Sequence, residues 1–284
     1  MVAAPFGGET ICLAERFCAY IARPGATLTT HIGMLLFPRL TQLDLTGPYE
    51  VFARMPDTRV HLVSHSLETV VSDGGLALAP NTTFDDCPPL DVLFVPGGPG
   101  ISGAIESRPT LAFLQQRAPA AQYVTSVCTG ALVLGAAGLL AGYRATTHWL
   151  SLDLLPIVGA IPVSERIVID RNRITGAGVT AGIDFGLVVA GQLFGADVAR
   201  AIQLMMEYDP APPFDSGSPR TASAALVTRI TERCQKLQDE RKRLLMASRK
   251  QMVRPLPDGR ESGRGIRSRD RLTPAFDPVE EKPR

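Results

Sequence analysis

The residue of this chain best placed to do chemistry is Cys128, in the stretch QYVTSVCTGALVL at residues 122–134. A buried strand is predicted to end at Val127, and a helix is predicted to begin within the next two residues. Cys128 therefore falls in a sharp strand-to-helix turn, an arrangement that presents a nucleophile at the end of a strand. The helix N-terminus favours a thiolate, which is the reactive form of cysteine. The alternative is a buried, inert thiol, and spacing alone leaves both open.

A carboxyl group, Asp44, follows the first predicted strand in the motif QLDLTGP at residues 42–48. Both of its neighbours are leucines, and an acid in apolar surroundings tends to have a raised pKa and to donate a proton at neutral pH. The alternative is a helix N-cap, because aspartate caps a helix start well. Taken alone, Asp44 fits the cap better.

A glycine-rich segment, VPGGPG at residues 95–100, directly follows another predicted strand. Here Gly97 and Gly98 leave backbone N–H groups free to face a ligand, as in an oxyanion hole. The alternative is a plain tight turn, because the segment matches neither a dinucleotide-binding nor a P-loop fingerprint.

Two further polar side chains, His148 and Asp184, are weighed as candidates for the site. His148, in ATTHW at residues 145–149, could act as a base for Cys128, but a structural histidine beside the only tryptophan is the commoner case. Asp184 follows a turn that opens a helix, so a role in the helix's first turn is favoured over catalysis.

Short apolar runs separated by helical stretches predict the sheet that would bring these residues together. Strands are expected at residues 32–37, 60–63, 92–95, 123–127 and 167–169, and helices at residues 45–54, 103–117, 130–140 and 180–194. This alternation predicts a flavodoxin-like α/β fold, a doubly wound and mostly parallel sheet with helices on both faces. Ligands of such sheets bind at the carboxyl ends of the strands. Residues 69–79 predict a hairpin that turns at Gly74 and Gly75.

The chain is predicted to hold one domain with loose ends. Residues 1–30 lack sustained periodicity and are interpreted as an unstructured extension, and residues 31–246 as the catalytic domain. That domain closes with an amphipathic helix over residues 222–246. Residues 247–284 are predicted to form a basic, disordered tail. Residues 233–284 contain 15 Lys and Arg against 8 Asp and Glu, a net of +7, which leaves the rest of the chain at −6.

Composition narrows the class of protein. Its 284 residues are 45% hydrophobic and 20% charged, which fits a globular chain, and no apolar run is long enough to cross a membrane. Five scattered cysteines without a C-x-x-C motif argue against a disulfide scaffold and against a zinc site. The N-terminus does not resemble a secretory signal, so the cytoplasm is the expected compartment.

Several of these motifs together resemble the ThiJ/PfpI superfamily, which has the class I glutamine amidotransferase-like fold, and within it the isonitrile hydratase branch. The resemblance runs from about residue 32 to about residue 232. Its motifs are LFP at residues 36–38, QLDLTGPY at 42–49, VPGG at 95–98, TSVCTGALVLGAAGLL at 125–140, ATTHW at 145–149, TAGIDF at 180–185 and EYDPAPPFDSGSP at 207–219.

The resemblance implies a catalytic nucleophile at Cys128, an acid at Asp44 and a neighbouring hydroxyl at Thr129. Many relatives carry glutamate at the acid position and histidine after the cysteine, so Asp44 and Thr129 favour isonitrile hydration. The implied reaction adds water to an isonitrile through a cysteine thioimidate and gives an N-substituted formamide. Asp44 would alternate between acid and base, and backbone N–H groups near Gly97 and Gly98 would orient the adduct. The resemblance implies a homodimer, a small-molecule substrate, and no metal or organic cofactor.

Two other classes of function stay open. A closely similar domain occurs in AraC-type transcriptional regulators as a ligand sensor, but only 65 residues follow Pro219 here, with one predicted helix instead of two helix-turn-helix units. The tail mixes arginine, glycine and proline with acidic residues, a composition typical of a solvated linker, so nucleic-acid binding by the tail is not expected. Glyoxalase, deglycase or amidase chemistry at the same cysteine is the other alternative, which Asp44 and Thr129 disfavour without excluding it.

Overall fold

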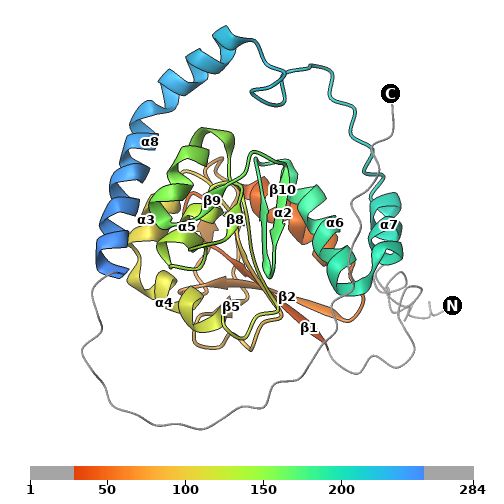
Figure 1. The fold of residues 1–284 in the computed structure, drawn as a ribbon. Helices are drawn as coiled ribbons and strands as arrows, with labels where there is room; N and C mark the ends of the chain where they lie inside the picture. The colour runs from red at the N-terminus through yellow and green to blue at the C-terminus, as the bar shows by residue number, and fades with distance from the viewer. Residues whose placement is uncertain (1–28, 253–284) are drawn as a thin grey trace, which may run out of the picture. The chain divides into compact units, whose positions relative to one another are not determined.

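The computed structural model describes residues 29–252, built around a seven-stranded sheet of order β10-β11-β7-β6-β1-β2-β5 (Figure 1). Its strands are β1 (Thr30–Leu35), β2 (Thr58–Ser64), β5 (Thr82–Thr83), β6 (Val92–Val95), β7 (Tyr123–Val127), β10 (Ile167–Asp170) and β11 (Arg173–Gly176). All neighbouring strands are parallel except β10 and β11. The parallel order β2-β1-β6-β7-β11 is that of the flavodoxin-like fold, so the predicted fold class is confirmed.

Helices cover both faces of the sheet. They are α2 (Gln42–Phe52), α3 (Ile101–Glu106), α4 (Arg108–Arg117), α5 (Gly130–Ala136), α6 (Ala181–Phe194), α7 (Ala196–Met205), α8 (Ala224–Met252) and the 3-10 helix η1 (Trp149–Val158). Helix α2 packs against α6, which packs against α7, whereas α3, α5, η1 and α8 pack together as a second group. The rings of Phe52, Phe94 and Phe185 meet between α2, β6 and α6. Because helices cover both faces of the sheet, the central strand β6 (VLFV) is apolar and buried along its whole length.

The predicted helix over residues 103–117 is in fact two helices, α3 and α4. Ser107 separates them, and its hydroxyl oxygen accepts a hydrogen bond from the Thr110 N–H at 3.3 Å. A serine N-cap followed by Pro109 inside the first turn is a strong helix start, which explains the break.

The strand predicted at residues 167–169 is present as β10, but it is the antiparallel edge strand of the sheet. The parallel place beside β7 belongs to β11, which the sequence analysis missed. All four residues of β11 are buried, yet it begins with an arginine and lacks a long apolar run. The Arg173 side chain is accommodated because its Nε donates to the Leu139 carbonyl at 2.7 Å and its guanidinium lies over the Tyr143 ring.

The predicted hairpin is present as β3 (Val70–Val71) and β4 (Ala77–Leu78), paired antiparallel. It packs on the loop that follows β1. The Arg39 N–H donates to the Val71 carbonyl at 2.8 Å, and the Thr41 hydroxyl donates to Asp73 Oδ2 at 2.8 Å. The hairpin therefore holds the chain that leads into α2. A second two-stranded sheet pairs β8 (Arg144–Ala145) with β9 (Ile161–Pro162).

The predicted helix over residues 222–246 is α8, which ends six residues later, at Met252. The start of a disordered tail at residue 247 is therefore wrong for residues 247–252. The Ser248 hydroxyl donates to the Ala136 carbonyl at 3.0 Å, and Arg249 Nη1 donates to the Ile157 carbonyl at 3.3 Å, so this last stretch is tied to the body. The extension predicted for residues 1–30 lies outside the described residues up to position 28, as does the predicted tail from residue 253. In the part of the chain that is described, no helix has the length and apolar character needed to cross a bilayer.

Candidate active site

The predicted site residues come together at the carboxyl ends of three neighbouring strands. Asp44 lies in α2 after β1, Gly97 and Gly98 follow β6, and Cys128 and Thr129 follow β7. The strand order reverses between β1 and β6, which is where ligands bind in open α/β sheets. Two hydrogen bonds join the three segments: the Gly97 N–H donates to Asp44 Oδ2 at 3.0 Å, and the Gly98 N–H donates to Thr129 Oγ1 at 3.0 Å.

Cys128 occupies the predicted turn in a conformation that side chains rarely adopt, with φ +55°. The turn is held on both sides, because the Cys128 N–H donates to the Gly176 carbonyl at 3.0 Å and the Thr147 hydroxyl donates to the Cys128 carbonyl at 2.8 Å. Backbone strain of this kind clusters at functional sites. The side chain is 5% exposed.

Contrary to expectation, this environment does not favour a thiolate. Burial raises the pKa of the Cys128 thiol well above its ordinary value of 9.0, and the neighbouring Asp44 raises it further. Hydrogen bonds from the backbone and side chain of Thr129 lower it, but by less. Desolvation of the charged form thus outweighs the hydrogen bonds from Thr129, so the thiol form of Cys128 is favoured and a base is needed to ionise it.

Asp44 is positioned to be that base. It is fully buried, and burial raises its pKa from 3.8 to about 7, against the opposing influence of the Cys128 thiol and the Gly97 N–H. The carboxyl of Asp73, at the hairpin turn, adds to the rise. The N-cap interpretation is wrong, because α2 begins at Gln42 with Thr41 in the cap position. Within the described residues, Asp44 Oδ1 makes no well-formed hydrogen bond, so it is free to exchange a proton with a bound molecule.

The two loop glycines hold the acid and the hydroxyl in this structure. Their N–H groups, expected to face a ligand, are both engaged, with Asp44 and Thr129. Gly97 is required by close approach, since a Cβ there would lie 2.5 Å from the Thr129 nitrogen and 2.8 Å from Asp44 Oδ2. Gly98 has φ +130°, in the region that favours glycine.

His148 and Asp184 both make structural contacts. His148 Nδ1 accepts a 3.4 Å hydrogen bond from the Leu150 N–H and caps η1, and burial lowers its pKa. Asp184 lies in the first turn of α6 and pairs with Arg166, whose Nη2 also donates to the Thr180 carbonyl. Both residues have the structural roles that the sequence favoured.

Arg241 in α8 is the site neighbour that sequence reasoning missed. Its guanidinium donates through Nη2 to the Gly98 carbonyl at 3.3 Å and through Nη1 to the Ser151 hydroxyl at 3.2 Å. The side chain is 5% exposed and electrostatically coupled to Cys128. The signal that could have found it is its spacing, since it lies three and four residues before the buried Leu244 and Leu245 on one face of the helix.

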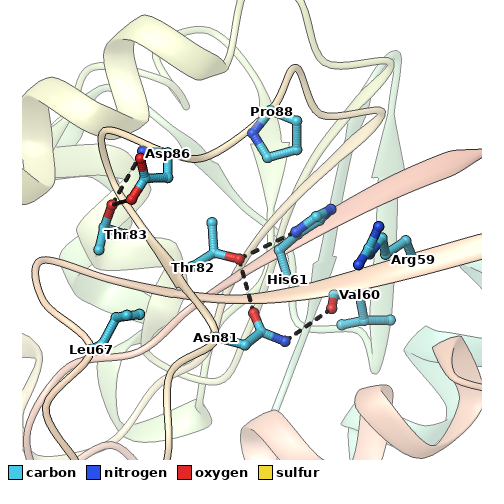
Figure 2. Close-up of a pocket in the computed structure, with 9 residues that line it drawn as sticks. All are labelled: Arg59, Val60, His61, Leu67, Asn81, Thr82, Thr83, Asp86 and Pro88. Atoms are coloured by element: carbon cyan, nitrogen blue, oxygen red, sulfur yellow. Dashed lines mark hydrogen bonds between the residues drawn. The ribbon is translucent and has the colours of Figure 1, made fainter.

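A separate pocket of about 300 Å³ lies between β2 and β5 (Figure 2). Its polar groups mostly bind one another: Asn81 Oδ1 accepts from the Thr82 hydroxyl at 2.9 Å and from the Leu62 N–H at 2.8 Å, and the hydroxyl lies 3.3 Å from His61 Nδ1. None of the predicted site residues lines it. Over residues 29–252, moreover, no three His, Cys, Asp or Glu side chains form a group that could hold a metal ion.

Comparison with known proteins gives a consistent family match. The DJ-1/PfpI family model matches residues 30–192. The chain is 58% identical over 206 residues to an isonitrile hydratase of Pseudomonas putida, an alignment that covers 72% of this chain and 90% of that protein. A ThiJ/PfpI family protein from Pseudomonas syringae, known from its crystal structure, superposes with a TM-score of 0.75 at 47% identity and covers 77% of this chain and 91% of its own.

A regulator is a more distant relative. The HTH-type transcriptional regulator GbdR of Pseudomonas aeruginosa is 33% identical over 187 residues, which is 63% of this chain but only 50% of the regulator. This chain therefore matches half of that protein's length.

Proposed function

This chain belongs to the DJ-1/PfpI family, and from that premise we propose that it hydrates isonitriles to N-substituted formamides. The observation that carries the proposal is the buried pair of Cys128 and Asp44, in which a carboxyl with a pKa of about 7 lies beside a protonated thiol. Such a pair delivers a proton and a nucleophile to the same atom, which is what the terminal carbon of an isonitrile needs. The 58% identity to an isonitrile hydratase supports the choice of substrate.

In the first step, the Asp44 carboxylate takes the proton from the Cys128 thiol as the sulfur attacks the terminal carbon of R–NC. Asp44 then delivers that proton to the same carbon, and the product is a thioimidate, R–N=CH–S–Cys128. One S–C bond and one C–H bond form, and no group leaves. Asp44 ends this step ionised again, so it is ready to act as a base.

In the second step, Asp44 removes a proton from water as the water oxygen adds to the thioimidate carbon, and Asp44 passes that proton to the nitrogen. Collapse of this adduct breaks the S–C bond, moves the hydroxyl proton through Asp44 to the sulfur and releases R–NH–CHO. The two steps consume one water and regenerate the thiol. They require neither a metal nor an organic cofactor.

We assign Thr129, Gly97 and Gly98 supporting roles in this scheme. Thr129 contributes hydrogen bonds at the sulfur, and its hydroxyl is held by the Gly98 N–H. Gly97 fixes the carboxyl of Asp44 through its N–H. The two glycines thereby orient the adduct through the residues that touch it, in keeping with the general value of pre-organised donors.

The test is formamide production from cyclohexyl isocyanide by wild type, Cys128→Ala and Cys87→Ala. Cys87 is a buried free thiol outside the site, so its removal controls for a lost core sulfur. We expect turnover by wild type and Cys87→Ala, none by Cys128→Ala, and an adduct heavier by one isonitrile in the mass spectrum of quenched wild type. Near-normal turnover by folded Cys128→Ala would refute the covalent scheme.

We also propose that the chain works as a cytoplasmic homodimer. Two large apolar side chains, Leu204 and Phe214, are 82% and 80% exposed, and either could contact a second copy of the chain. The proposed chemistry needs a reduced Cys128, and among residues 29–252 the cysteines Cys87, Cys128 and Cys234 form no disulfide with one another. Light scattering of the purified chain should give twice the chain mass, and Phe214→Ser should lower it.

The regulator alternative follows from the identity to GbdR. It would apply if wild type, folded and with Cys128 reduced, turned over no isonitrile yet bound a specific DNA duplex in a salt-sensitive way. A panel of glyoxals and amides offered to the same samples tests the other thiol chemistries, since each gives a distinct product.

A further inference from the structure

Arg241 is a buried cation that the exposed carboxylate of Glu240, its neighbour in the sequence, attracts electrostatically without forming an ion pair with it. None of the ion pairs formed by residues 29–252 includes it, although its side chain is only 5% exposed. Burial lowers its pKa, as expected for a charge removed from water. Because buried charges in proteins are normally paired, a buried and unpaired guanidinium points to an anion that binds when the site is in use.

Two hydrogen-bond donors in this cluster also lack acceptors. Two of its nitrogens donate to Gly98 and Ser151, but its Nε is buried without a partner in the described part of the chain, and so is Nε2 of Gln238. The Ser151 hydroxyl ties the two residues together, since it donates to Gln238 Oε1 at 2.9 Å and accepts from Arg241. The unpaired N–H groups of Arg241 Nε and Gln238 Nε2, beside the positive charge of the guanidinium, suit the two oxygens of a carboxylate.

This donor cluster lies against the proposed active site. Arg241 binds the carbonyl of Gly98, whose N–H holds the Thr129 hydroxyl next to Cys128. Arg241 also interacts electrostatically with Cys128 and with His148. Burial and the nearby Arg241 lower the pKa of His148, which favours the neutral imidazole, so this ring does not add a second positive charge. Helix α8 begins at Ala224, whereas the DJ-1/PfpI match ends at residue 192, so the family match does not include the arginine.

We propose that Arg241 and Gln238 bind a carboxylate on the substrate, so that the chain acts on small isonitriles that carry a short carboxylate arm. The inference rests on the proposed function for its reaction and names the substrate class. The isonitrile carbon would face Cys128 and Asp44, and the carboxylate would face α8. Arg241 then sets specificity, while Asp44 and Cys128 carry out the chemistry.

The test compares isocyanoacetate with its methyl ester, which has the same skeleton without the charge. We expect wild type to prefer the acid, and Arg241→Met to raise the KM for the acid about tenfold or more while raising that for the ester by a much smaller factor. Arg241→Lys keeps the positive charge but lacks the planar guanidinium, so its KM for the acid should fall between those of wild type and Arg241→Met. Arg243→Met, an exposed arginine on the same helix, is the matched control and should behave as wild type.

A binding measurement separates this inference from the proposed reaction. Calorimetry with N-formylglycine, the product expected from isocyanoacetate, needs no turnover, and its methyl ester is the neutral control. If wild type binds the acid through Arg241 but hydrates no isonitrile, the carboxylate site stands and the proposed function fails. If isonitriles are hydrated but acid and ester bind equally, or Arg241→Met weakens both alike, Arg241 only supports the fold and the inference is overturned.

Discussion

Replacing Asp44 with asparagine should make the protein more stable at alkaline pH while it abolishes the activity. The native chain holds the Asp44 proton up to a pH of about 7, whereas the unfolded chain releases it near 3.8. The raised pKa therefore makes the folded state most stable at low pH, where Asp44 is protonated in both the folded and the unfolded chain. This part of the folding stability is lost as the pH rises from about 4 to about 7. The asparagine of the variant has no proton to lose, and its side-chain oxygen can still accept from the Gly97 N–H.

The size of the change in unfolding free energy follows from the difference between the Asp44 pKa values in the folded and unfolded chain. The full difference between 3.8 and about 7 corresponds to about 4 kcal/mol. Between pH 5 and pH 8 the part that changes is about 2.5 kcal/mol, because at pH 5 the unfolded state has already lost most of its proton. The gap in unfolding free energy between Asp44→Asn and wild type should therefore move by that amount in favour of the variant. Any fixed cost of the amide cancels in this comparison.

Urea unfolding of both proteins at pH 5, 6, 7 and 8 measures the gap, with other titrating groups common to the two. Asp153→Asn, which removes an exposed carboxylate, is the control and should show a constant gap. A gap between Asp44→Asn and wild type that stays constant from pH 5 to pH 8 would show that Asp44 titrates like an ordinary carboxyl, and the argument from burial would be wrong.

Three further predictions concern the same residues. The kcat/KM for cyclohexyl isocyanide should rise about tenfold per pH unit below a pH of about 7 and level off above it. The reason is that Asp44 must be ionised to accept the thiol proton, while the raised pKa of Cys128 keeps the thiol protonated. A profile that is flat from pH 5 to pH 8 would contradict this. Thr129→Val should lower kcat about tenfold to a hundredfold, because it removes the hydroxyl that meets the Gly98 N–H, and Thr129→Ser should restore most of the rate; equal rates for the valine and serine variants would argue against a role for the hydroxyl. Gly97→Ala should destabilise the fold by about 1–3 kcal/mol and reduce turnover, because the added Cβ has no room beside Thr129. The control is Gly74→Ala, whose Cβ would meet nothing within 4 Å and which should be neutral in thermal unfolding and in the activity assay. A Gly97→Ala protein as stable and active as Gly74→Ala would show that the close approach does not matter.

Local patterns were enough to predict much of the fold and the placement of the site. The apolar run of β6 and the strand-to-helix turn at Cys128 are encoded in adjacent residues, and so is the hairpin of β3 and β4. The strand β11 escaped because its arginine is accommodated by Leu139 and Tyr143, which are remote in sequence. The protonation states of Cys128 and Asp44 also depend on contacts with residues remote in sequence.

Residue spacing alone could not predict the protonation of the Cys128–Asp44 pair. A helix N-terminus favours a thiolate, and the sequence contains that feature, but the opposing desolvation depends on how completely the surrounding chain encloses Cys128. The Asp73 carboxyl, which acts on Asp44 from the hairpin, is likewise supplied by tertiary structure. Both effects oppose ionisation, so the pair holds its proton near neutral pH.

The segment Gly97–Gly98 joins the two charged parts of the site. At one end the Gly97 N–H holds the Asp44 carboxyl, and at the other the Gly98 carbonyl receives the Arg241 guanidinium. Because Gly98 also holds Thr129, a displacement of α8 would shift the hydroxyl beside the nucleophile as well as the cation. A substrate carboxylate that binds Arg241 would therefore do two things at once: it would neutralise a buried charge, and it would stabilise the loop geometry on which the Cys128–Asp44 pair depends. On this reasoning, the carboxylate arm should improve kcat as well as KM, and Arg241→Met should lose both improvements together.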